Sequence, residues 1–143
     1  MAAYDSGLVS GFSKDGGPVT IAYPGVTDPF DTEAVTCDVI LHGPRHSEQP
    51  PAVRVFATGA SGQAGTFLAT IGGHQNGFAV AGTAGSTEGT DKFSPGKQGN
   101  YAYLVTIPFA TLNDVRSGNT VWLTFVPQAA APLHIRTQLT GTI

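Results

Sequence analysis

The fold is decided by the stretch Glu33-Ala-Val-Thr-Cys-Asp-Val-Ile-Leu-His-Gly43, then Pro44-Arg-His-Ser-Glu-Gln-Pro-Pro51, then Ala52-Val-Arg-Val-Phe-Ala57. Its first part has an apolar side chain at every second position, at Val35, Cys37, Val39 and Leu41, which is the period of a half-buried strand. The last part alternates in the same way. The prolines between the two parts cannot donate the hydrogen bonds of a strand ladder. The stretch therefore predicts a strand, a polar connection and a second strand.

Similar segments recur on both sides of this stretch. Alternating or apolar runs lie at residues 7–12, 19–23, 65–71, 101–107, 121–126 and 133–143. We expect the first two to form a hairpin or a strand pair at a sheet edge, and 121–126 to be an inner strand with both faces covered. Seven or eight strands without βαβ alternation predict an all-β fold, an antiparallel two-sheet β-sandwich, with a closed barrel as the alternative. Pro108 and Gly118 are placed to begin and end one short helix at 109–115.

Composition narrows the class of protein further. A chain of 143 residues predicts a single domain spanning 1–143. The net charge is -3, and the seven Lys and Arg residues are scattered, which disfavours nucleic-acid binding. There is no apolar run long enough for a membrane span and no leader-like N-terminus, so we expect no membrane partner and no export signal. Cys37 is the only cysteine, so we expect it to be a buried small hydrophobe without a disulfide.

Residues 72–100 break the strand pattern. This stretch is rich in glycine, and apart from a brief strand at 78–81 we expect it to be a long loop. Loops of this length are often where a protein binds its partners. Phe78 and Phe93 are the partner-binding candidates, because they have few apolar neighbours in the loop. The simpler interpretation is that both rings pack down onto the sheet, and the sharper one is that they enter a partner's pocket.

No catalytic set of residues is evident. His42, His46 and His74 could supply the three imidazoles of a zinc or copper site. However, Pro44 rules out a helical face for the first two, and nothing in the spacing brings the third to them. Exposed or loop-capping histidines are the simpler interpretation. The sequence also has no Gly-x-Ser-x-Gly elbow and no phosphate-binding glycine loop. We therefore expect no enzyme activity, no bound metal and no cofactor.

The order of the segments resembles a known family. The segments are Gly7-Leu-Val-Ser-Gly11, Pro18-Val-Thr-Ile21, Val39-Ile-Leu-His-Gly-Pro-Arg-His-Ser47, Val53-Arg-Val-Phe-Ala57, Ala64-Gly-Thr-Phe67, Tyr103-Leu-Val-Thr-Ile-Pro108 and Val121-Trp-Leu-Thr-Phe-Val-Pro127, before a final strand. Together they resemble the C-terminal β-sandwich domain of tyrosinases and polyphenol oxidases. In that family the sandwich covers a helical domain that holds two coppers with six histidines. This chain has four histidines and no histidine-rich helix, so the resemblance implies the covering role without the oxidase activity.

Three functions remain to be weighed. The first is a non-catalytic interaction module that docks on a protein partner, for which the resemblance implies the catalytic domain of a type-3 copper oxidase, a copper-dependent phenol oxidase. The second is a homo-oligomer, a self-assembling structural subunit of a virion or shell. The third is a carbohydrate-binding module, in which exposed aromatic rings would stack on sugars. Trp122 is embedded in a strand pattern, which makes it a poor platform for that purpose.

Overall fold

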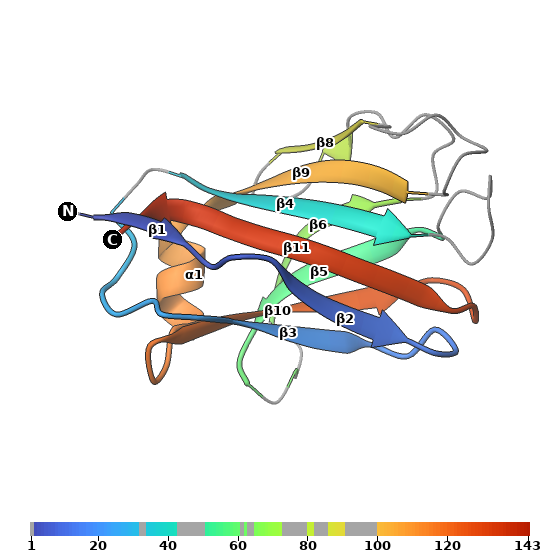
Figure 1. Ribbon diagram of the computed structural model, residues 1–143, viewed down its shortest axis with the longest axis horizontal. Coiled ribbons are helices and arrows are strands. Elements are labelled where there is room, and N and C mark those ends of the chain that lie inside the picture. Colours follow the sequence, from blue (N-terminus) through green and yellow to red (C-terminus); the bar gives the residue numbers. More distant parts are fainter. Residues whose placement is uncertain are drawn as a thin grey trace.

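The computed structural model describes residues 2–31, 34–42, 51–60, 62, 65–72, 80–81, 86–90 and 100–143. Within these ranges the chain forms two antiparallel β-sheets packed face to face, with one short helix at one end of the sandwich (Figure 1). The predicted all-β, two-sheet architecture is confirmed. No helix in the described ranges is long and apolar enough to cross a membrane.

The larger sheet has seven strands in the described part of the chain, and β4 and β9 lie at its centre. The strand order is β1-β11-β4-β9-β8-β7, with β2 also paired to β11. The strand bounds are β1 (Ala3–Asp5), β2 (Val9–Ser13), β4 (Ala34–His42), β7 (Val80–Ala81), β8 (Ser86–Thr90), β9 (Asn100–Pro108) and β11 (Leu133–Thr142).

The smaller sheet has the order β3-β10-β5-β6. Its strands are β3 (Val19–Pro24), β5 (Val53–Thr58), β6 (Thr66–Ile71) and β10 (Thr120–Pro127). The strand β10 lies between β3 and β5, which confirms that it is an inner strand. Val121, Leu123 and Phe125 are fully buried between the sheets, because alternate side chains of a strand point to the same face.

The two strands of the Glu33 to Ala57 stretch lie in opposite sheets. The strand β4 pairs with β11 and β9 in the larger sheet, whereas β5 pairs with β10 and β6 in the smaller one. Their alternating apolar side chains meet across the interior, and Val39 and Val55 are both completely buried. This stretch therefore contributes a strand to each half of the core.

The expected opening hairpin is not formed, because β2 and β3 also divide between the sheets. The strand β2 pairs with β11, and β3 pairs with β10. At Gly11 of β2, a Cβ would lie only 2.6 Å from a methyl group of Val19. The two edge strands therefore approach closely along one side of the sandwich. A hairpin-like pattern does not distinguish this crossing from a pair within one sheet.

The short helix is α1 (Phe109–Val115), at the position predicted from the sequence. Leu112 is its fully buried residue. The side chain of Asn113 fixes the segment before β4, because its Oδ1 accepts a hydrogen bond from the amide of Phe30 (2.7 Å) and its Nδ2 donates one to the carbonyl of Phe30 (3.2 Å). The helix therefore closes the end of the sandwich at which β4 begins.

One strand occurs where the sequence predicts loop. Ser86–Thr90 forms β8, which pairs with β9 on one side and with β7 on the other. Its sequence, Ser-Thr-Glu-Gly-Thr, has no apolar alternation. Backbone pairing with β9 supplies the strand geometry that the side-chain pattern does not indicate.

Candidate functional site

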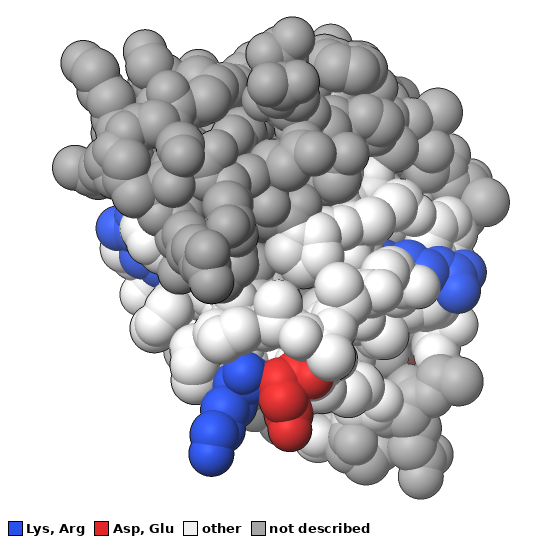
Figure 2. Space-filling view, turned by 90° about the vertical axis from the view of Figure 1, so that its right-hand side faces the viewer, with Lys and Arg blue, Asp and Glu red and all other residues white. Residues whose placement is uncertain are grey.

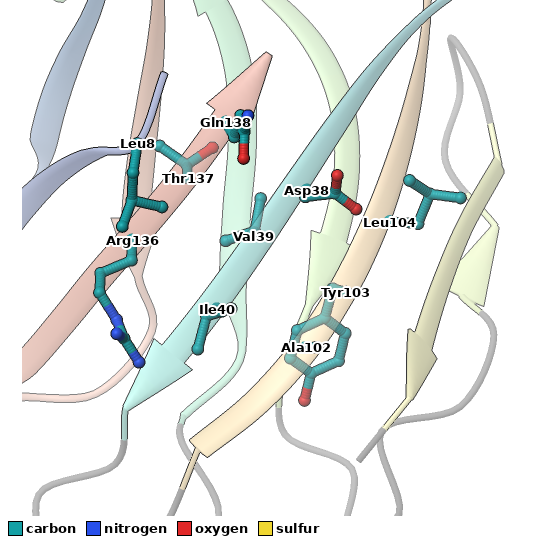
Figure 3. Close-up of a pocket in the computed structure, with 10 residues that line it drawn as sticks. All are labelled: Leu8, Asp38, Val39, Ile40, Ala102, Tyr103, Leu104, Arg136, Thr137 and Gln138. Atoms are coloured by element: carbon teal, nitrogen blue, oxygen red, sulfur yellow. The ribbon is translucent and has the colours of Figure 1, made fainter. Parts of the chain in front are cut away.

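The outer face of the larger sheet carries a depression of about 350 Å³ (Figure 3). It lies over the middle of β11, β4 and β9, beside the connection between β1 and β2. Register explains its composition, because Arg136, Ile40 and Ala102 form one row across the three strands and Gln138, Asp38 and Leu104 form the next. Outward positions on neighbouring strands thus converge. The lining residues are Leu8, Asp38, Val39, Ile40, Ala102, Tyr103, Leu104, Arg136, Thr137 and Gln138.

Hydrogen bonds hold one wall of this depression in place. The Nε2 of Gln138 donates to Oδ1 of Asp5 (2.7 Å), and the amide of Gly7 donates to the same oxygen (2.8 Å). These bonds, that from Gln138 first, lower the pKa of Asp5. The hydroxyl of Ser6 also accepts a bond from the amide of Leu139 (2.8 Å). The β1–β2 connection is therefore fixed beside β11, with Leu8 at the rim and 63% exposed.

Two opposite charges lie at the depression without pairing. Figure 3 shows that the side chains of Arg136 and Asp38 extend to different sides of it. Both residues are exposed, and among the described residues Arg136 has no hydrogen bond, ion pair or ring contact. None of the five donors of its guanidinium is used by a described residue.

A row of three rings crosses one end of the same face. Phe12 of β2 lies opposite His134 of β11, and His134 lies opposite His42 of β4. The ring centroids of Phe12 and His134 are 4.5 Å apart, and those of the two histidines are 6.4 Å apart. Phe12 is 50% exposed. This ring row lies one register row beyond Arg136 and Ile40.

Of the five candidate site residues from the sequence, the structure describes one. His42 lies in the ring row, while His46, His74, Phe78 and Phe93 lie outside the described residues. Within the described ranges, no group of three His, Cys, Asp or Glu residues could hold a metal ion. Sequence reasoning did not pair His134 with His42. Strand alternation places both on outward positions, but the register that makes them neighbours is not visible in the sequence.

Three polar side chains lie close together in the interior between the two sheets. The hydroxyls of Tyr23 and Thr137 are 3.1 Å apart, and the thiol of Cys37 is 3.3 Å from the hydroxyl of Thr137. Burial raises the pKa of Cys37 to about 11 and that of Tyr23 well above its usual value. The thiol is therefore protonated at neutral pH and is a poor nucleophile. As the sequence predicts, Cys37 is a buried structural residue.

The outer face of the smaller sheet is covered by its own side chains. The guanidinium carbon of Arg54 lies 5.2 Å from the ring centroid of Phe56 and 4.9 Å from that of Phe67. Trp122 lies on this outer face and is only half-buried, because it alternates with the inward Val121 and Leu123.

Charge is sparse where the sandwich is viewed end-on. Figure 2 shows a few separated basic side chains, and one acidic group beside a basic one, on a surface that is otherwise uncharged in its described part. The described part of this surface therefore carries no cluster of basic side chains that would attract a polyanion.

Compared with the known protein families, the sequence matches none. It matches no curated protein either. Among solved structures, an arabinose-bound GH51 α-L-arabinofuranosidase is similar to 90% of this chain, with 12% identity and a TM-score of 0.42. The chain spans 18% of the length of that enzyme. A likeness of this size supports no conclusion about activity.

Proposed function

We propose that this chain is a non-catalytic interaction module that docks on a protein partner through the outer face of its larger sheet. The observation that carries the proposal is the depression of about 350 Å³ at the middle of that face. Its lining combines apolar side chains, such as Ile40 and Leu104, with the charge of Arg136, which pairs with none of the described residues. This is the composition of a protein interface core, where apolar anchors and arginine are enriched.

Exposed apolar side chains on the same face support the proposal. Leu8 is 63% exposed and Phe12 is 50% exposed. Single exposed apolar residues are common on protein surfaces. Leu8, however, lines the depression, and Phe12 lies in the ring row on the same face. Burying both would contribute about 2 kcal/mol each to binding.

The catalytic domain of a type-3 copper oxidase is the first partner to test. The order of the sequence segments, which resembles the sandwich that covers such domains, supports this choice. In this role the chain supplies no catalytic copper pair and transforms no substrate. It acts by covering the entrance to the partner's active site.

The test is to mix the chain with such a catalytic domain and to measure binding by calorimetry and diphenol oxidation by absorbance. We expect slower oxidation, and at least tenfold weaker binding by L8D and R136A. The matched control is F109D, which places the same charge on an exposed apolar position of α1. Failure of the unaltered chain to bind or slow the oxidase would remove this partner, and equal binding by L8D would remove this face.

Self-association is the second candidate, because the exposed pair Leu8 and Phe12 could equally meet the same pair on a second copy. Symmetric dimers join one surface patch to itself. Sedimentation velocity at increasing concentration separates the two functions. A dimer that is lost in L8D but retained in F109D would favour self-assembly, and a monomer throughout would leave the docking proposal as the only one.

A further inference from the structure

The two histidines of the ring row are placed as a cross-strand pair. His42 on β4 and His134 on β11 are direct register partners on neighbouring antiparallel strands. Side chains at such positions have Cβ atoms about 5 Å apart and project to the same side of the sheet. Their ring centroids are 6.4 Å apart, with the ring planes at 79°.

We propose that His42 and His134 together bind one divalent transition-metal ion of the zinc, nickel or copper class. Imidazole nitrogen suits these metals and binds zinc at about 2.0–2.1 Å, so two imidazoles on one tetrahedral ion have ring centres roughly 5 Å apart. The observed separation of 6.4 Å is larger than this, so the two rings turn toward each other when the ion binds. Water would complete the coordination.

The surroundings of His134 restrict how its ring can turn. The ring of Phe12 lies 4.5 Å from it, tilted by 40°. In addition, β11 is hydrogen-bonded to β2 on one side and to β4 on the other. A ligand pair carried by such paired strands loses little freedom when a metal binds.

The neighbouring charge limits the affinity. Arg136 lies two residues from His134 on the same exposed side of β11, and its positive charge opposes a divalent cation. Asp38 is exposed on β4 at the same face, but it lies two register rows from His42. We therefore expect a site of modest affinity. The metal-site proposal does not depend on the proposed docking function.

The test is calorimetric titration of the intact chain with ZnCl2 and with NiCl2 at pH 7.5, together with the electron paramagnetic resonance spectrum of the Cu2+ form. We expect one ion per chain and nitrogen hyperfine structure from imidazole. H42A and H134A should each lower the affinity at least fivefold. Binding should also weaken as the pH falls, because protons compete with the metal for imidazole nitrogen.

The matched control is the double variant H46A/H74A, which removes the other two histidines and should retain the affinity. Circular dichroism establishes that each variant is folded, and His134 is exposed enough for its loss to be tolerated. Three results would overturn the proposal. These are no saturable binding at millimolar metal, a change of less than fivefold in H42A or H134A, and a loss in H46A/H74A as large as that in H134A.

Discussion

The two outer faces of this sandwich are built by the same strand alternation but differ in how they meet solvent. On the smaller sheet, Arg54 covers two phenylalanine rings. Beside them Thr124 joins the hydroxyls of Thr20 and Thr58, at 2.9 and 2.7 Å. Thr58 and Thr124 are buried although they point away from the core. This face is closed by its own residues.

The larger sheet leaves its face open. At the middle of that face the outward residues are an isoleucine, an alanine and a leucine with separated charges, and they enclose a depression instead of filling it. The open face should therefore tolerate substitutions that the closed face does not. Under the docking proposal, binding belongs to the larger sheet, and the smaller sheet contributes mainly stability.

The largest expected effect on stability comes from replacing Gly62, a glycine that packs against the outer face of the smaller sheet. A Cβ on Gly62 would fall on Oγ1 of Thr20 and within 3.6 Å of Oγ1 of Thr124, and the residue has a φ of 70°. We expect G62A to lower the free energy of unfolding by about 3 kcal/mol, from backbone strain of about 1–2 kcal/mol and overpacking of about 1–3 kcal/mol. Urea denaturation monitored by fluorescence measures the change.

The control for this substitution lies beside the open face. Gly7 has the same φ of 70°, but a Cβ there would meet nothing within 4 Å. G7A should therefore show the backbone strain alone, about 1 kcal/mol. The difference between the two variants isolates the steric contact, and equal destabilisation by both would contradict the closed-face description.

A somewhat smaller effect on stability is expected from the thiol of Cys37, which is buried between the two sheets. The pKa of Cys37 is raised from 9.0 to about 11, chiefly by burial. Above about pH 9 the unfolded chain releases this proton first, so the folded state loses stability as the pH rises. We expect a loss of about 2 kcal/mol between pH 9 and 11, measured by urea titration at each pH. Tyr4, raised to about 12 by burial and by Asp5, adds to the loss at higher pH.

The matched variant is C37A, in which the slope between pH 9 and 11 should be shallower although its stability at pH 7 is also changed. The thiol of the unaltered chain should react with a disulfide reagent only on unfolding. Stability that stays constant up to pH 11, or fast labelling of the folded chain, would show that the thiol is not held in the interior.

The elements of this fold were predictable because their signals are local. Alternation indicated β4, β9, β10 and β11, and Pro108 with Gly118 indicated the helix at residues 109–115. Sheet membership was not predictable, because the same alternating pattern serves either sheet. The sequence did not show that β4 and β5 lie in opposite sheets, or that Ser86–Thr90 is a strand.

The candidate site was less predictable than the fold. His42 was recognised as a possible metal ligand, but its neighbour is His134, and 92 positions separate the two along the chain. Arg136 and Asp38 are visible as outward residues, yet only the register places them around one depression. Binding surfaces on a sheet depend on long-range pairing, and a single sequence does not determine that pairing.

The smallest expected effect on stability is that of replacing one arginine on each face. Arg54 lies over two aromatic rings, and R54A should cost about 1 kcal/mol through lost cation–π contact and lost cover over the rings. R136A, on the open face, removes no hydrogen bond, ion pair or ring contact with a described residue and should change the stability by less than about 0.5 kcal/mol. Denaturation of both variants under one condition tests this. If R136A costs as much as R54A, Arg136 is a structural residue and is not held available for a partner.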